Sequence, residues 1–201
     1  MDQFLPFMLF AFVASITPGP TNILVLTNSS RHGWRAAMPI ILGACGGAAA
    51  LVLLVGTSLG DLLLRHQLLQ TAMSWVGIGW LSLLAWQIFR APAAAIEPHG
   101  ISPGQPRLGL LGAATLQLVN PKTWMMALAV VSVFAGAEAD RGLRVVYLSL
   151  VFFLIAIPCM SAWAWLGVSA ARLCRSATAL QRFNRCMAVL LLVSTWMTLW
   201  I

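Results

Sequence analysis

The sequence predicts an all-α membrane protein with six transmembrane helices, and three observations support this fold class. Hydrophobic residues make up 60% of the 201-residue chain and charged residues only 8%, whereas soluble domains carry about 25% charged residues. The few charges are clustered, which leaves long uncharged stretches between them. A membrane-spanning helix needs about 20 apolar residues. We therefore expect helices at 4–28, 36–59, 67–89, 109–135, 145–170 and 183–200.

The first predicted helix lies where a signal peptide would lie, and the last contains the shortest uncharged stretch. The first apolar stretch follows Asp2 instead of a basic segment, and it is longer than the core of a signal peptide, so we expect it to be retained. The last uncharged stretch, 186–201, is short. It spans the membrane if its helix begins earlier and Arg182 and Arg185 extend their head groups to the membrane surface.

Arginines are distributed unequally between the two sets of predicted loops. The loops near 31–35, 90–107 and 172–185 share one side of the membrane and hold eight arginines, whereas the other side holds three. The positive-inside rule places the first set in the cytoplasm and both termini outside it. The net charge of +7 therefore reports topology. No basic stripe for nucleic acid is visible.

A proline-rich segment divides the chain into two halves. We expect a first three-helix half at 1–89, a cytoplasmic linker at 90–107 and a second three-helix half at 108–201. Three spans per half give the halves inverted topology, so any internal duplication is an inverted repeat. The two halves show no convincing match side by side, and the indication of a repeat is positional.

The first and fourth predicted helices are each interrupted near their middle. The first interruption comprises Thr17, Pro18, Gly19, Pro20, Thr21 and Asn22, and the second runs from Gln117 through Asn120, Pro121 and Lys122 to Thr123. Proline removes a backbone donor. In hydrocarbon, a broken helix survives only where the break faces protein or water. We therefore expect both helices to be broken at mid-membrane, with simple proline kinks as the alternative.

Both interruptions also have the pattern of a helix start. Thr17 before Pro18, and Asn120 before Pro121, each match an N-cap residue followed by proline at the first helical position. A half-helix that begins there presents free N–H groups and a partial positive charge. Two such ends near the bilayer centre favour an anionic group such as a carboxylate.

Lys122 is the only charged residue between 108 and 137. A charge at the bilayer centre costs roughly 2.5–3.5 kcal/mol, which favours a functional role. That role is carboxylate binding, proton exchange or both; the alternative is a lysine extended to the membrane surface. We expect no catalytic residue and no metal site. The predicted substrate-binding residues are Thr17, Pro18, Gly19, Pro20, Thr21, Asn22, Gln117, Asn120, Pro121 and Lys122.

Three further features are more typical of packing than of chemistry. The cysteines at 45, 159, 174 and 186 lack metal-ligand or C-x-x-C spacing, so we expect free or packed thiols. The spacing from Gly43 to Gly47 indicates close helix packing rather than a dinucleotide loop, because no strand precedes it. Trp124 is expected to pack in the core, with lining of a cavity as the alternative.

The motifs at the two interruptions resemble those of a known family. Residues 17–24, followed by His32-Gly33-Trp34-Arg35, resemble the opening of the lysine-exporter (LysE/RhtB) family of amino-acid exporters, and Asn120-Pro121-Lys122 resembles its second motif. The first segment is most similar to the cysteine/O-acetylserine exporter branch. The resemblance implies amino-acid efflux driven by the proton gradient. Some members of the family carry an acidic residue in the second helix. This chain has the glycine-rich segment 43–47 there and no acidic residue.

These observations lead to one functional expectation. We expect a secondary-active exporter of small neutral amino acids or derivatives, because no buried carboxylate is visible for a cationic cargo. It would lie in the bacterial inner (plasma) membrane as a multi-pass protein with periplasmic termini. Its partners would be an amino-acid substrate, protons and the lipid bilayer, with a homo-oligomer left open and no nucleic acid, cofactor or enzymatic activity. A membrane thiol-redox carrier and a non-transporting membrane subunit are the alternatives.

Overall fold

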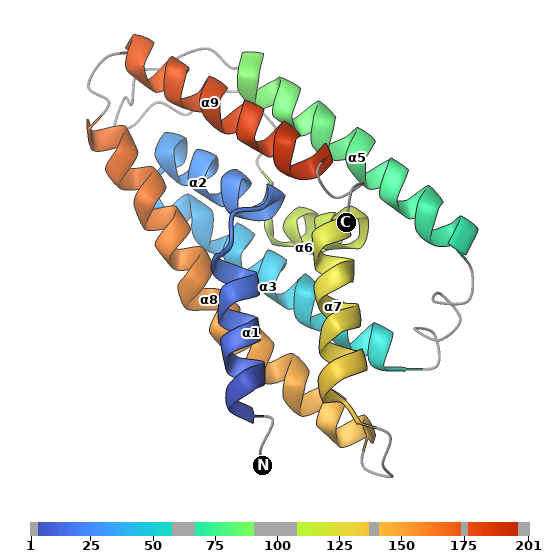
Figure 1. Cartoon of the computed structure of the whole chain (residues 1–201). Helices are drawn as coiled ribbons and strands as arrows, with labels where there is room; N and C mark the ends of the chain where they lie inside the picture. Colours follow the sequence, from blue (N-terminus) through green and yellow to red (C-terminus); the bar gives the residue numbers. More distant parts are fainter. Residues whose placement is uncertain (1–3, 58–66, 91–107, 137–140, 174–176, 197–201) are drawn as a thin grey trace.

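The computed structural model describes residues 4–57, 67–90, 108–136, 141–173 and 177–196 (Figure 1). These residues form helices and no strand, which confirms the all-α prediction for the described part of the chain. The helices are α1 (Phe4–Ile16), α2 (Pro20–His32), α3 (Trp34–Gly56), α5 (Gln67–Arg90), α6 (Leu110–Val119), α7 (Pro121–Phe134), α8 (Arg141–Leu173) and α9 (Ala177–Trp196).

Four of the predicted helices correspond to one helix each, namely α3, α5, α8 and α9. α8 extends beyond the predicted 145–170 at both ends, and α9 begins at Ala177 instead of residue 183. The predicted bounds were drawn at charged residues, which mark where a helix leaves the hydrocarbon. Helical hydrogen bonding continues past that point, so these helices are longer than their apolar stretches.

The first predicted helix is divided into α1 and α2, which are bent by 53° relative to each other. The N-cap of α2 is Gly19, with Pro20 at the first helical position, so the predicted N-cap Thr17 is wrong. Because a residue before proline avoids the helical region, Gly19 is extended (φ −162°) and the helix starts only after it. Thr17 instead follows the last residue of α1, and its amide donates to the Val13 carbonyl at 3.0 Å.

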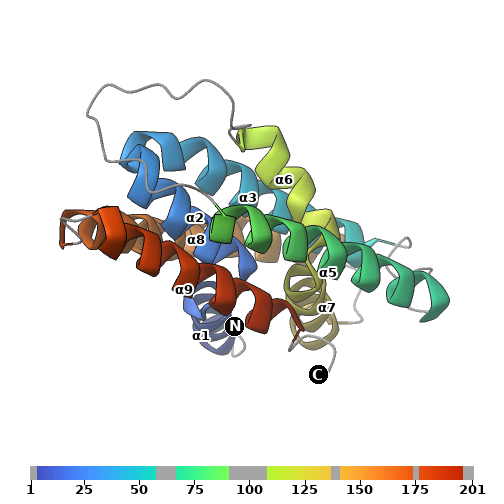
Figure 2. The same ribbon diagram turned by 90° about the horizontal axis from the view of Figure 1, so that it is seen from above.

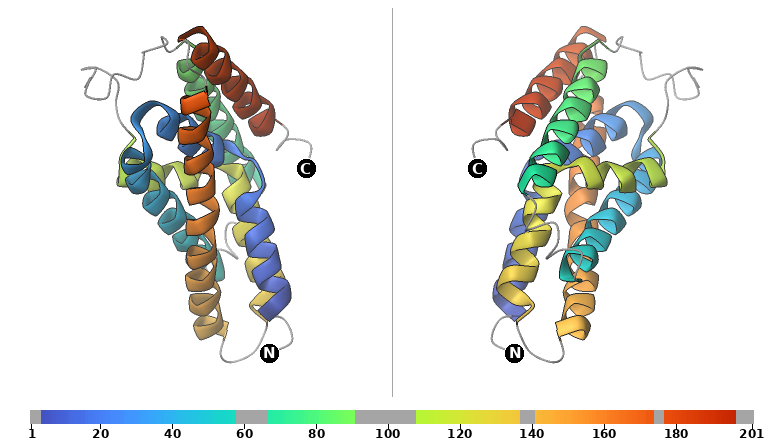
Figure 3. Two further views of the ribbon diagram at one scale, coloured as in Figure 1. Left: turned by 90° about the vertical axis from the view of Figure 1, so that its left-hand side faces the viewer. Right: turned by 90° about the vertical axis from the view of Figure 1, so that its right-hand side faces the viewer.

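The fourth predicted helix is divided at Asn120 into α6 and α7. The side chain of Asn120 accepts a hydrogen bond from the Lys122 amide at 3.2 Å, and Pro121 occupies the first position of α7. The predicted N-cap at Asn120 is therefore confirmed. Figure 3 shows the consequence: α6 lies across the bundle, whereas α7 runs down beside α1.

Each half packs mainly against the other half. α3 contacts α6 and α7, and α8 contacts α1 and α2. α5 and α9 lie side by side across the face of the bundle nearest the viewer in Figure 2, whereas α3 and α6 lie together in the upper part of that view. In Figure 1, α1 runs up to its break and α7 runs down from its own, and α3 and α8 run in opposite directions.

Two described helices are long and apolar enough to cross a membrane, α3 and the segment Arg141–Ala171 of α8. The bent pair of α1 and α2 passes the same criterion if it counts as one span. α6 and α7 are apolar but short. The described part of the chain thus has two or three apolar spans, as a membrane protein requires.

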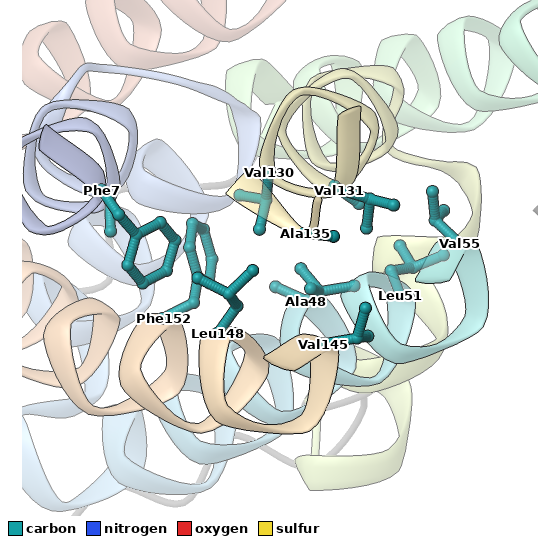
Figure 4. Packing of buried hydrophobic residues seen from close by; sticks show 13 residues of the cluster. Phe7, Ala48, Leu51, Val55, Val130, Val131, Ala135, Val145, Leu148 and Phe152 are labelled. Atoms are coloured by element: carbon teal, nitrogen blue, oxygen red, sulfur yellow. The ribbon is translucent and has the colours of Figure 1, made fainter. Parts of the chain in front are cut away.

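The central core joins α1, α3, α7 and α8 (Figure 4). Phe7 of α1 and Phe152 of α8 lie next to each other in it, and Phe7 also meets Phe134 edge-on at 5.3 Å between ring centroids. Large apolar side chains such as Leu154 and Trp165 are exposed on the outside of the bundle. Extensive exposed apolar surface is typical of a protein that contacts lipid or another protein. The interior, by contrast, also buries polar side chains such as Asn22, Gln117 and Asn120.

Glycines allow helix backbones to touch at two places between the halves. A Cβ atom on Gly43 would overlap the carbonyl of Leu110, and one on Gly47 would lie 2.6 Å from the carbonyl oxygen of Ala114. The predicted packing role of the Gly43–Gly47 spacing is therefore confirmed between α3 and α6. On α8, a Cβ on Gly167 would overlap a backbone carbonyl and a serine hydroxyl of α2.

Candidate functional site

Lys122 extends from the first turn of α7 into the break between α1 and α2. Its Nζ donates a hydrogen bond to the carbonyl oxygen of Thr17 at 2.7 Å. The side chain passes directly over Gly19, where a Cβ atom would lie 2.8 Å from the lysine Cδ and 2.9 Å from its Nζ. The lysine of the second half therefore contacts the break of the first half.

The carbonyls at the end of α1 are covered by side chains from three other helices. A helix leaves its last four carbonyls without intrahelical partners. Here the Ser15 carbonyl accepts from Asn22 Nδ2 at 2.8 Å, and that of Ile16 accepts from the Trp163 indole at 3.1 Å. The Ser15, Ile16 and Thr17 carbonyls therefore each accept a hydrogen bond from a side chain of the protein.

The N-termini of the two half-helices differ. Gly19 offers no side-chain cap, so the first-turn amides of α2 lack the partners that they would have in a helix interior. In α7, by contrast, the amide of Lys122 is bonded to the Asn120 side chain and that of Thr123 to the Asn120 carbonyl at 3.1 Å. The expected pair of open helix ends is thus reduced to one, because only Asn120 has a side chain that can cap.

A network of neutral side chains lies beside the lysine. Gln117 Oε1 accepts hydrogen bonds from the hydroxyls of Thr123 and Thr21, at 2.8 and 3.3 Å. Asn120 Nδ2 donates to the Thr21 hydroxyl at 3.0 Å, and Gln117 Nε2 donates to the Ala113 carbonyl at 3.0 Å. Because buried polar groups are costly when unpaired, these mutual bonds hold α2, α6 and α7 together at the breaks.

A small cavity of about 30 Å³ opens where the two breaks meet. A water molecule needs roughly 10–15 Å³ by this measure, so the cavity holds about two waters. Its polar lining residues are Ser15, Thr21, Asn22, Asn120, Lys122 and Thr123. Its apolar lining residues come mainly from α3, α7 and α8 and include Ala44, Cys45, Ala48, Met126, Phe152, Ala156 and Met160.

The structure brings four of the ten predicted binding residues to the cavity, namely Thr21, Asn22, Asn120 and Lys122. The other six are not among its lining residues: Thr17, Pro18, Gly19, Pro20, Gln117 and Pro121. Most of these six shape the site indirectly, through the two breaks, the polar network or the carbonyl that Lys122 binds. Pro18 is exposed and has no contact with the cavity.

Ser15 is a cavity residue that the sequence reasoning missed. It is only 5% exposed, and its hydroxyl has no hydrogen-bond partner in the described structure. Other helical hydroxyls, such as those of Thr27 and Ser29, donate to backbone carbonyls in the preceding turn. The available signal was a lone polar residue in the apolar run 4–16, two residues before the break.

The remaining predicted packing residues behave as expected where they are described. Cys45 and Cys159 are buried free thiols and Cys186 is an exposed one, whereas position 174 lies outside the described residues. Trp124 donates to the Leu118 carbonyl at 2.8 Å and packs against the central core instead of lining the cavity. Within the described ranges, no group of three or more potential metal-ligating side chains comes together.

Comparisons with known proteins agree on one family. Residues 12–195 match the family model described as LysE type translocator. The cysteine/O-acetylserine efflux protein of Salmonella paratyphi A is 27% identical over 163 residues, which cover 80% of each chain. The homoserine/homoserine lactone efflux protein of Salmonella typhimurium is 29% identical over 162 residues, which cover 80% of this chain and 78% of the relative. A membrane protein of Vibrio cholerae is 28% identical over 186 residues, covering 90% and 88%. No solved structure matches.

Proposed function

The chain belongs to the LysE type translocator family, and on this premise we propose that it is a secondary-active exporter of small neutral amino acids or their derivatives. It acts in the bacterial inner membrane and uses the proton gradient. The observation that carries this proposal is the position of Lys122, whose ammonium lies over a helix break, beside an uncapped helix end and a cavity. Family membership confirms the resemblance inferred from the motifs at the two breaks.

We propose six crossings in two inverted halves, with α1–α2 and α6–α7 as one crossing each. In such a repeat α1, α2, α3 and α5 correspond to α6, α7, α8 and α9. The contact between α1 and α8 then corresponds to that between α6 and α3. The contact between α2 and α9 likewise corresponds to that between α7 and α5. An inverted repeat accounts for both correspondences. The excess of arginine in alternate loops supports periplasmic termini.

The substrate carboxylate binds between Lys122 and the first turn of α2. A carboxylate is a stronger acceptor for the ammonium than the carbonyl of Thr17, because it carries a full negative charge whereas the carbonyl is neutral. The uncapped helix end adds up to about 2 kcal/mol for a partly buried anion. The lysine therefore exchanges a neutral partner for an anionic one when substrate arrives.

The remainder of the substrate faces the small side chains of α3 and α8. The cavity of about 30 Å³ beside Ala44, Ala48 and Ala156 leaves little room, which favours a short side chain. The described ranges contain none of the chain's acidic residues, so a cationic side chain finds no counter-charge there. The named cargoes of the relatives support the same class, since cysteine, O-acetylserine and homoserine are small and neutral.

Proton coupling is assigned to Lys122. Among the residues that line the cavity, it is the only cationic one and none is acidic. A proton that leaves the ammonium frees the nitrogen from its carboxylate partner, which links proton release to substrate release. The absence of an acid from residues 43–47 supports a lysine as the exchanging group.

Uptake into inverted membrane vesicles under an imposed pH gradient tests this function. Radiolabelled alanine, cysteine, threonine and lysine are compared for the wild type, Lys122→Ala and Met125→Ala. We expect gradient-dependent uptake of the small neutral amino acids, lost by at least tenfold in Lys122→Ala. Met125 is a matched control, because it lies one turn along α7 and is exposed.

Two outcomes contradict the proposal. Preference for lysine over the neutral amino acids contradicts the substrate class. Wild-type uptake by Lys122→Ala, at equal protein in the membrane fraction, contradicts the role of the lysine. Loss of uptake in Met125→Ala would show that α7 tolerates no substitution. Lys122→Arg, which keeps the positive charge, is then compared with Lys122→Gln, which removes it and keeps a long polar side chain.

A further inference from the structure

Two arginines lie on a pair of stacked aromatic rings at the end of α5. The rings of Trp86 and Phe89 are 6.2 Å apart between centroids and nearly parallel, with an angle of 6°. The guanidinium of Arg90 lies 4.4 Å from the centre of the Trp86 ring, and that of Arg185 on α9 lies 5.3 Å from the centre of the Phe89 ring. Trp86 is 52% exposed and Phe89 37%, so the group lies on the outer surface.

A third arginine reaches the same turn of α5 from α2. Arg31 Nη2 donates to the Ile88 carbonyl at 3.3 Å. Its Nε is buried and has no hydrogen-bond partner in the described structure. All five acidic residues of the chain fall outside the described ranges, so no carboxylate of the described helices neutralises the three guanidinium groups.

We propose that Arg31, Trp86, Phe89, Arg90 and Arg185, the arginine–aromatic patch, bind the phosphate group of an anionic phospholipid. A guanidinium stacked on a ring keeps its N–H edge available and holds it in a fixed plane. Arginine forms paired, charge-assisted hydrogen bonds to phosphate from such an arrangement. Arg31 adds a third positive charge beside the same turn of α5.

The surroundings of the patch favour a lipid over a soluble phosphate compound. Tryptophan and other aromatic rings gather at the level of the lipid head groups. Below the patch, α5 and α9 expose apolar side chains such as Leu83, Val189 and Leu190, against which acyl chains can lie. Basic pockets between helices on the cytoplasmic side are typical binding sites for anionic head groups. The proposal does not depend on the transport function.

Native mass spectrometry of the full-length protein in detergent measures the proposed binding. Phosphatidylglycerol is titrated first, with phosphatidylcholine and glycerol phosphate as separate arms. We expect phosphatidylglycerol to bind and the other two not to bind at the same concentration. Each of Arg90→Gln and Arg185→Gln should weaken binding about fivefold, since an arginine near an anionic lipid surface contributes roughly that factor.

Arg35→Gln is the matched control, because Arg35 is an exposed arginine of α3 that makes none of the contacts defining the patch, and its loss should leave the affinity unchanged. Trp86→Leu retains every charge and should still weaken binding, because Arg90 loses the ring that orients it. Equal weakening in Arg35→Gln would show a diffuse charge effect and overturn the proposal. Equal binding of phosphatidylcholine, or of glycerol phosphate alone, would also overturn it.

Discussion

The ammonium of Lys122 donates to the carbonyl oxygen of Thr17 at 2.7 Å and so joins α7 to the end of α1. The C-terminal end of α1 carries a partial negative charge and the N-terminal end of α2 a partial positive one. The end of α1 therefore stabilises the positive charge of Lys122, and the start of α2 stabilises an anion that binds next to the lysine. The absence of a side chain on Gly19 makes this position possible.

Substitution of Gly19 by alanine should remove transport. The new Cβ would lie 2.8 Å from Lys122 Cδ and 2.9 Å from Nζ, so the lysine must leave its position. We expect uptake in vesicles to fall by at least tenfold with normal protein levels. Gly79→Ala is the control, because nothing lies within 4 Å of its added Cβ. Normal uptake by Gly19→Ala would mean that the lysine position is not needed.

The three glycines at 43, 46 and 47 should respond differently to alanine, although they are close in sequence. A Cβ on Gly47 would lie 2.6 Å from the Ala114 carbonyl oxygen, whereas one on Gly46 meets nothing within 4 Å. Forced overlap in a packed interior costs about 1–3 kcal/mol. Thermal unfolding in detergent should therefore show a lower midpoint temperature for Gly43→Ala and Gly47→Ala and an unchanged midpoint for Gly46→Ala. Equal midpoints for all three would argue against the close contact of α3 and α6.

Removal of the Ser15 hydroxyl should change substrate choice without loss of stability. This hydroxyl makes no hydrogen bond in the described structure, whereas that of Ser149 donates to the Ala49 carbonyl at 2.8 Å. We expect Ser149→Ala to lower the free energy of unfolding by about 1 kcal/mol. Ser15→Ala should leave it unchanged and alter the ratio of cysteine to alanine uptake. An unaltered ratio would show that the hydroxyl does not contact the substrate.

Replacement of Asn120 by alanine should destabilise the protein. The variant loses the cap of α7 and the bond to the Thr21 hydroxyl. Loss of an N-cap costs about 1 kcal/mol, and loss of the hydrogen bond that the Thr21 hydroxyl accepts adds about 1 kcal/mol. Chemical denaturation in detergent should detect this against Thr115→Ala, whose exposed hydroxyl only donates within α6. Equal stability of the two variants would show that the cap contributes little.

The sequence was sufficient to locate the breaks and Lys122, but not to orient the groups around them. Proline and glycine act on the local backbone, so their effect could be read from positions 18–20 and 120–121 alone. The position of the N-cap in α2 required a second local effect, the restriction that Pro20 places on Gly19. The role of Ser15 could not be read at all, because it depends on residues of α3, α7 and α8 that are distant in sequence and meet it only in the fold.

The two glycine contacts determine which parts of the bundle can move together. Gly43 and Gly47 fasten α6 to α3, and Gly167 fastens α2 to α8, with backbone against backbone in both pairs. Tight contacts of this kind allow little sliding. Each pair is therefore a rigid unit. α1 joins the α2–α8 unit through residues 17–19, and α7 joins the α3–α6 unit at Asn120. These two short segments are the natural hinges for α1 and α7, and the cavity between them is lined by Asn120 and by Ser15 and Thr21, which flank residues 17–19.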